Sequence, residues 1–144
     1  MKKNTELLEI KEIPYQDTWD LRHRLMWPNE PFSFVQLPED PGGIHYGLFV
    51  ENILTAIVSV FIKGKEAQFR KFATLSSEQG KGYGTSLINY MMVQLAAKGV
   101  ERVWCNARVN KTDYYQRFGM IKTTTTYSKR GIDFVILEKL GVSI

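Results

Sequence analysis

A glycine-rich run, Gln79-Gly80-Lys81-Gly82-Tyr83-Gly84-Thr85, is the part of this sequence best suited to hold a charged ligand. It separates an aromatic-rich stretch typical of a strand from a stretch whose apolar residues recur at helical spacing. Where a strand passes through glycines into a helix, the N–H groups of the first helical turn and the positive end of the helix dipole face the loop. Glycines also let the backbone approach an oxygen-rich ligand closely, and Lys81 adds a positive charge. The run therefore predicts an anion site.

The spacing of these glycines limits the kind of anion. A nucleoside triphosphate loop needs G-x-x-x-x-G-K-[ST], whereas Lys81 is followed by Gly82. A dinucleotide fingerprint needs G-x-G-x-x-G and an acidic residue at the end of the next strand, and the next expected strand leads into Asn106. Neither signature fits.

The run does match Q-x-x-G-x-G, the pyrophosphate-binding signature of the GNAT superfamily of acetyl-CoA-dependent N-acetyltransferases, which this sequence resembles. A second run, Tyr115-Gln116-Arg117-Phe118-Gly119-Met120, resembles the Y-E-K-L-G-F run that follows the fifth strand in that superfamily, with Met120 replacing the usual Phe. The two motifs stand in the right order and at the right separation. The resemblance covers most of the chain and is specific from Phe69 to Met120.

The resemblance implies acetyl transfer from acetyl-CoA to a primary amine of a small molecule or peptide, by direct attack in a ternary complex. The pantetheine arm would pair with the backbone of the strand that precedes the loop, and the pyrophosphate would lie on the loop itself. Asn106 or Asn110 could bond the same arm through a side-chain amide, although surface loop asparagines are an equally good interpretation. The residues assigned to the cofactor acetyl-CoA are Phe72, Thr74, Gln79, Gly80, Lys81, Gly82, Tyr83, Gly84, Thr85, Asn106 and Asn110.

Tyr115, which falls on the motif tyrosine, is the expected catalytic residue. A phenol of pKa near 10 stays protonated at neutral pH and can donate to a thiolate of pKa about 8.5. Its neighbour Tyr114 should pack elsewhere. The acceptor ammonium, of pKa about 10.4, must first lose a proton, and no single base stands out. Glu30, His45 and Glu51 lie on the acceptor side by analogy, and deprotonation through ordered water is equally open.

Basic residues weakly indicate the chemical class of the acceptor. Arg22 and Arg24 on the first expected helix, with Arg70 or Lys71 on the central strand, would suit an amine that also carries a carboxylate or phosphate, because arginine pairs such groups bidentately. Strand alternation should let only one of Arg70 and Lys71 face the site. A solvated basic face is the competing interpretation for the helix. An acyl-CoA-binding sensor or interaction module without catalysis is the alternative function.

These residues need strands and helices to position them. The pattern predicts the order β-α-β-β-β-α-β-α-β-β, which is an α+β fold with helices flanking a mixed, mostly antiparallel sheet. It is the GNAT order, except that a proline-rich loop at 27–43 takes the place of a second N-terminal helix. Strands are expected at 6–13, 44–50, 53–62, 67–75, 100–107, 120–127 and 132–140. Helices are expected from Asp17 or Thr18 to Pro28, from the glycine loop to Gly99, and at 111–118.

The composition is that of an ordinary globular protein. With 144 residues, 44% hydrophobic and 24% charged, the chain should form one domain over 1–144 that needs neither disulfides nor a metal. Its net charge of +4 is scattered, without the basic stripe of a nucleic-acid-binding protein. No apolar run approaches the roughly 18 to 20 residues that span a bilayer, and a single cysteine agrees with a reducing compartment. We expect a cytoplasmic protein without nucleic-acid or membrane partners, and a homodimer is left open.

Overall fold

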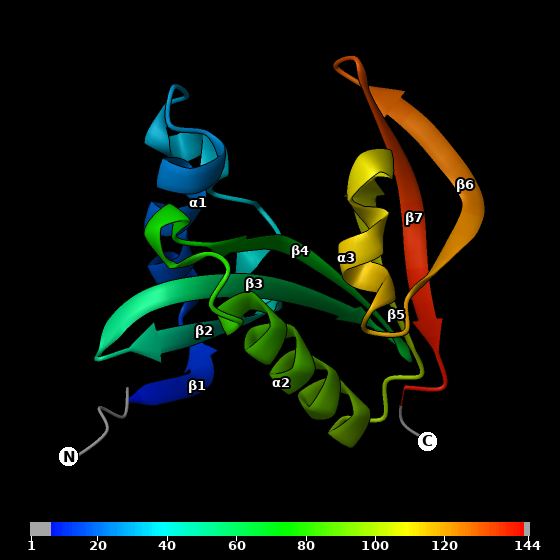
Figure 1. Ribbon diagram of the computed structural model, residues 1–144, viewed down its shortest axis with the longest axis horizontal. Coiled ribbons are helices and arrows are strands. Elements are labelled where there is room, and N and C mark those ends of the chain that lie inside the picture. The colour runs from blue at the N-terminus through cyan, green and yellow to red at the C-terminus, as the bar shows by residue number, and fades with distance from the viewer. Residues whose placement is uncertain (1–6, 143–144) are drawn as a thin grey trace. The chain divides into compact units, whose positions relative to one another are not determined.

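The computed structural model describes residues 7–142, which fall into two compact units (Figure 1). The first contains the chain up to Val60 together with Lys71–Met91, and the second contains Phe61–Arg70 together with the chain from Met92 onward. The elements are β1 (Leu8–Ile13), α1 (Trp19–Met26), β2 (Ile44–Val50), β3 (Ile53–Lys63), β4 (Glu66–Thr74), α2 (Tyr83–Ala97), β5 (Arg102–Arg108), α3 (Thr112–Gln116), β6 (Ile121–Lys129) and β7 (Ile132–Leu140).

The strands form a seven-stranded sheet in the order β1-β2-β3-β4-β5-β7-β6. β4 and β5 are parallel, and β1–β2, β2–β3, β5–β7 and β6–β7 are antiparallel. The predicted order of elements and the mixed, mostly antiparallel sheet are therefore confirmed. Most predicted boundaries agree with the structure within two residues. Glu6, which was included in the first predicted strand, lies outside the described residues.

In the first unit, β1, β2 and the start of β3 form an antiparallel meander. Glu51 and Asn52, which make the turn between β2 and β3, both have positive φ (50° and 67°), as the tight type I′ hairpin turn requires. Ile13, Leu21 and Ile57 form a buried cluster that joins β1, α1 and β3. Leu21 thus packs α1 against these strands.

Helix α1 begins directly after a 3-10 turn instead of at a side-chain cap. The helix was expected to begin at Asp17 or Thr18 and begins at Trp19, and neither of the two earlier side chains makes a capping hydrogen bond. The Thr18 hydroxyl donates to the carbonyl of Tyr15 (2.8 Å), and the Trp19 N–H donates to the carbonyl of Gln16. The turn continues into the helix, so its first N–H groups find backbone acceptors without a cap.

Helix α2 ends as the sequence predicts. The way it ends explains why β5 starts two residues after its predicted start. Gly99 has a φ of +83°, its N–H donates to Ala96, and the N–H of Val100 donates back to Leu95 (3.1 Å). This is a Schellman motif, in which the residue after the glycine still belongs to the cap. The predicted strand began at Val100, whereas β5 begins at Arg102.

In the second unit, β5 pairs with β7, and β6 pairs with β7 at the edge. The register of β6 shifts between Lys122 and Thr126, where the Thr123 hydroxyl donates to the carbonyl of Ile136 (2.8 Å) and accepts from the N–H of Thr125. Figure 1 shows β6 curving away from β7 along its middle. Bulges of this kind bend an edge strand and make it a poorer template for another strand.

The two faces of β5 differ in polarity. Val103, Cys105 and Ala107 are buried, while Asn106 and Arg108, which alternate with them, are exposed. Successive side chains of a strand point to opposite faces. One face of β5 thus belongs to the core, and the other carries polar groups that can meet a ligand.

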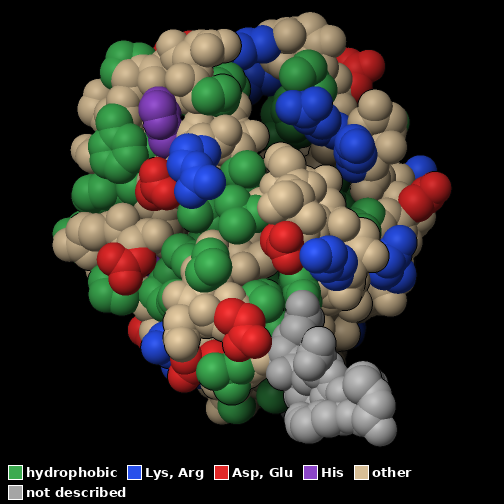
Figure 2. All heavy atoms as spheres, turned by 60° about the vertical axis from the view of Figure 1, so that its left-hand side comes forward, with side chains coloured by type: hydrophobic (Ala, Val, Ile, Leu, Met, Phe, Trp, Pro, Cys, Tyr) green, Lys and Arg blue, Asp and Glu red, His purple; other side chains and the backbone are tan. Residues whose placement is uncertain are grey.

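Among the described residues, no helix has the length and apolar character needed to cross a bilayer. On the face drawn in Figure 2, basic and acidic side chains both occur between apolar ones, and neither sign covers the face.

Candidate functional site

The glycine-rich run forms a turn between β4 and α2 in the first unit. A short 3-10 turn at Ser76–Glu78 leads into it, and α2 starts at Tyr83. Gly80 and Gly82 have φ values of +83° and +87°, which side-chain-bearing residues rarely adopt. A Cβ atom built on either glycine would meet nothing within 4 Å. The turn therefore presents its backbone to open space.

The N-terminus of α2 follows directly and supplies donors. The first backbone bond of the helix runs from the Ser86 N–H to the Gly82 carbonyl (3.0 Å). Gly84 and Thr85 precede this bond, so helical geometry gives their N–H groups no acceptor within the helix. They are oriented along the helix axis together with the positive end of its dipole, which suits an anion.

Two side chains of the run have contacts that the sequence could not specify. Gln79 donates from its amide to the carbonyl of Thr74 (3.2 Å), and so it braces the loop against the end of β4. Lys81 lies 3.1 Å from a carboxylate oxygen of Glu78. Its charge is therefore partly offset, and the backbone donors are the stronger feature of the anion site.

Strand β4 changes character in its middle. Its register with β5 comprises Glu66 to Gln68, paired with residues 102–104. Lys71 has a φ of +57°, which interrupts the strand, and from there to Thr74 the residues are all half-buried. The expectation that only one of Arg70 and Lys71 faces the site stays a prediction, and strand alternation cannot select between them because it does not persist through a left-handed residue. Arg70 lies over the ring of Phe61, at 5.7 Å.

Tyr115 lies on α3 in the second unit, half-buried among aromatic rings. The ring centroids of Phe69 and Tyr114 lie 5.8 and 5.3 Å from its own. Burial, with smaller contributions from Cys105 and Tyr114, raises the pKa of Tyr115 well above its usual range. The phenol is thus a proton donor at neutral pH. Tyr114 packs on Phe118, at 5.4 Å, as predicted for a packing residue.

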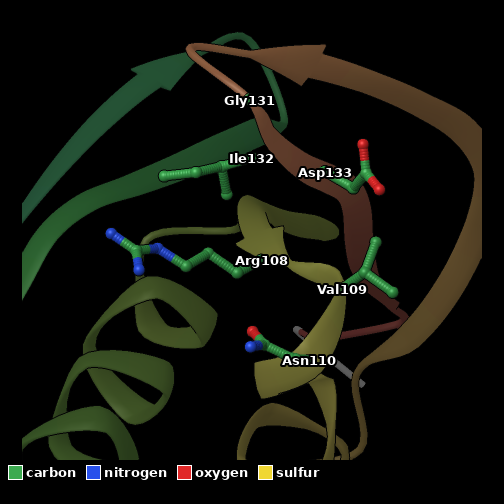
Figure 3. Close-up of a pocket in the computed structure, with 6 residues that line it drawn as sticks. All are labelled: Arg108, Val109, Asn110, Gly131, Ile132 and Asp133. Carbon is green, nitrogen blue, oxygen red and sulfur yellow. The ribbon is translucent and has the colours of Figure 1, made fainter.

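Asn106 and Asn110 are exposed in the second unit, on β5 and in the 3-10 turn after it. Asn110 lines a cavity of about 370 Å³ (Figure 3). The other lining residues are Arg108, Val109, Gly131, Ile132 and Asp133.

The predicted site residues are divided between the two units. Phe72, Thr74 and the run 79–85 belong to the first unit, and Asn106, Asn110 and Tyr115 belong to the second. Within the first unit the loop residues come together at the start of α2, as the sequence predicts. Within the second unit, Tyr115 is a ring neighbour of Phe69 on β4.

Comparisons with known proteins place the chain in a family. The profile described as "Acetyltransferase (GNAT) domain" matches residues 42–140. The uncharacterized N-acetyltransferase YitI of Bacillus subtilis (strain 168) is 32% identical over 122 residues, which covers 78% of this chain and 82% of that protein. The chain belongs to the GNAT acetyltransferase family.

Solved structures agree with the GNAT fold. The ribosomal-protein-S18-alanine N-acetyltransferase from Escherichia coli has a TM-score of 0.81 at 16% identity, covering 94% of each chain. A Bacillus subtilis acetyltransferase in complex with CoA has a TM-score of 0.70 at 17% identity, covering 94% of this chain and 99% of that one. At these identities the likeness concerns the fold.

A buried ion pair between Arg22 and Asp40 contradicts part of the predicted acceptor pocket. Arg22 is wholly buried on α1 and pairs with both carboxylate oxygens of Asp40, at 2.8 and 3.0 Å. Its remaining contacts are the carbonyl of Val35 (2.9 Å) and the hydroxyl of Ser59 (2.8 Å). Arg24 instead pairs with Asp20 on the helix surface. The prediction that Arg22 faces an acceptor is wrong, because its guanidinium is committed to the protein interior.

Asp40 is a structural residue that the sequence did not reveal. Burial alone would raise the pKa of Asp40, but hydrogen bonds from Arg22, Trp19 and the Leu37 N–H lower it below its usual value. The carboxylate therefore fastens the loop at 27–43 to α1. The only available signal was an acidic residue within a proline-rich loop, which does not identify its partner eighteen positions away.

His45 belongs to the same network and is not exposed as a base. Its Nε2 donates to the carbonyl of Asp40 (3.0 Å), because a carbonyl can only accept, and its Nδ1 accepts from the Ser59 hydroxyl (2.7 Å). Burial lowers the pKa of His45. Glu51 lies in the hairpin turn between β2 and β3. Glu30, the third candidate base, forms its hydrogen bonds to other described residues through its backbone: its carbonyl accepts from His23, and its N–H donates to the carbonyl of Trp27.

Proposed function

We propose that this GNAT chain transfers an acetyl group from acetyl-CoA to a primary amine, by direct attack in a ternary complex. The observation that carries the proposal is the turn before α2, where Gly80 and Gly82 take left-handed conformations and face open space. The family and the printed names of its relatives, an N-acetyltransferase and an acetyltransferase in complex with CoA, support the same activity.

The residues around the turn fit the phosphates of acetyl-CoA. The N–H groups of Gly84 and Thr85 would bind the pyrophosphate, since they precede the first bond of α2. Gln79 holds the loop in place, and the backbone near Phe72 and Thr74 would pair with the pantetheine arm. Bound there, the thioester supplies an activated acetyl group.

Tyr115 is proposed as the general acid. The amine nitrogen forms a bond to the thioester carbonyl carbon while the carbon–sulfur bond breaks, and the Tyr115 hydroxyl donates its proton to the departing sulfur. The proton lost by the nitrogen returns through solvent to the Tyr115 oxygen, so this step releases no net proton when it is counted from the neutral amine. Counted from the ammonium, the overall reaction releases one proton to solvent. Its raised pKa keeps the phenol protonated before this step.

Deprotonation of the acceptor ammonium is assigned to water. His45, which is buried and bonded at both ring nitrogens, is not placed to accept a proton from a bound amine. A cytoplasmic location remains a prediction from the sequence.

The function is tested by incubating the purified full chain with acetyl-CoA and a panel of amines, amino acids and peptides. Acetylated product and free CoA, both measured by mass spectrometry, should appear in equal amounts. Acyl-CoA that co-purifies with the protein but is never transferred to any amine would instead identify a binding module without catalysis.

A further inference from the structure

Two arginines on β5 have different surroundings. Arg102 is bonded through Nε to Glu138 (2.7 Å) and through Nη1 to Glu66 (3.2 Å), so its charge is neutralised by the protein. Arg108, at the other end of the strand, is exposed, and among the described residues its guanidinium has no hydrogen-bond or ion-pair partner. It lines the cavity of about 370 Å³ in the second unit.

An acidic residue of the same cavity does not neutralise Arg108. Asp133 accepts a hydrogen bond from the hydroxyl of Ser128. Figure 3 shows the Asp133 carboxylate directed away from the Arg108 guanidinium. The residues that line the cavity therefore include a cation, Arg108, and a neutral amide donor, Asn110.

The chemistry of these groups selects a carboxylate. A guanidinium presents a planar fork of donors that matches a carboxylate, and an amide adds a further donor. Val109 and Ile132 supply aliphatic surface, and Gly131 leaves space, since a Cβ atom there would meet nothing within 4 Å. Asp133, which also lines the cavity, repels a doubly charged phosphate more strongly than a singly charged carboxylate. The volume suits a small ligand.

We infer that Arg108 binds the carboxylate of the acceptor, so that the substrates are amines that also carry a carboxylate, such as amino acids. This inference rests on the proposed amine acetylation. It replaces the role that the sequence gave to Arg22, whose two terminal guanidinium nitrogens are buried and bonded to Asp40 and its neighbours. The phosphates of acetyl-CoA are assigned to the turn before α2, which leaves Arg108 for the acceptor.

A kinetic experiment compares each amino acid of a panel with its own carboxamide, which retains the amine and loses the charge. Wild-type kcat/KM should be about tenfold higher for the acids, the size expected for a charge-assisted hydrogen bond. Arg108→Gln should bring the ratio near one without changing the KM for acetyl-CoA. Lys111→Gln is the matched control, because Lys111 is an exposed cation three residues on that does not line the cavity. Equal rates for acids and amides, or an Arg108→Gln effect confined to the KM for acetyl-CoA, would overturn the inference.

A binding experiment needs no turnover and so separates this inference from the proposed function. N-acetyl-leucine and N-acetyl-leucinamide are titrated into the 15N-labelled full chain. The carboxylate should shift the amide signals at residues 108–110 and 131–133, the neutral amide should not, and Arg108→Gln should abolish the shifts. Identical shifts with both compounds, no shifts with either, or shifts that persist in Arg108→Gln would show that no carboxylate site exists. Failure to acetylate any amine would count against the proposed function alone.

Discussion

Tyr115 illustrates how a residue's surroundings fix its protonation state. Phenylalanine retains the ring contacts with Phe69 and Tyr114 while removing the proton. Tyr115→Phe should therefore lower kcat by about 10²- to 10⁴-fold and leave acetyl-CoA binding nearly unchanged. Single-turnover kinetics with calorimetric binding measures both quantities. Tyr114→Phe is the control, and wild-type turnover by both variants would remove the acid role from Tyr115.

Single residues also explain which features of the structure could not be predicted from the sequence. The partners of Arg22 come from the loop at 27–43 and from β3, and no local pattern announces a contact between positions so far apart. Lys71 likewise gives no sign of its left-handed conformation, since such a backbone is usually left to glycine or asparagine. The site roles given to Tyr115 and Gln79 come from local motifs, and they stay predictions.

At the scale of elements, the turn between β4 and α2 makes a testable contribution to binding. Gly82 is a poor test position, because any side chain there would also strain its left-handed backbone. Gly84 lies within the first turn of α2, where alanine is a better helix former than glycine. Gly84→Ala should therefore keep or raise the stability of the fold. It should weaken acetyl-CoA binding roughly tenfold or more, because the added methyl group would disturb the hydrogen bonds from the backbone to the charged pyrophosphate.

Calorimetric titration with acetyl-CoA measures this effect, and thermal unfolding checks the fold. Ser86→Ala serves as the control, because Ser86 is exposed on the same turn of the helix. Unchanged affinity in a folded Gly84→Ala protein would exclude the turn as the phosphate site.

The elements themselves were largely predictable from the sequence. β2 and β7 match the predicted ranges at both ends, because turn-forming residues flank clear apolar patterns. The end of α2 was marked by Gly99. The 3-10 turn that leads into α1 was not predictable, since it replaces a side-chain cap and leaves no separate signal in the sequence.

At the scale of the molecule, the network around His45 makes stability depend on pH. The pKa of folded His45 is lowered by burial and by the nearby Arg22 charge, against the opposing influence of Asp40 and Glu12. The unfolded chain, with a histidine pKa near 6.5, binds the proton more readily. Stability should therefore be full above about pH 6.5 and decline as pH falls through the lower folded pKa, by up to about 1.4 kcal/mol per pH unit. Asp40 adds a further loss only below its usual carboxyl range.

Urea unfolding at a series of pH values measures this decline, and NMR titration of the histidine rings assigns it. His23, the other histidine, provides the internal comparison. A His45 ring that titrates at or above the ordinary histidine pKa would contradict the prediction.

The buried thiol of Cys105 is a natural reporter of local opening in this protein. It is the chain's one cysteine, it is 2% exposed, and burial raises its pKa to about 12. A reagent that attacks thiolates can reach it only when β5 separates from its neighbours, because the folded state offers almost no thiolate and almost no access. The rate of alkylation therefore measures how often the second unit opens locally around Cys105. The measurement needs no label or engineered probe.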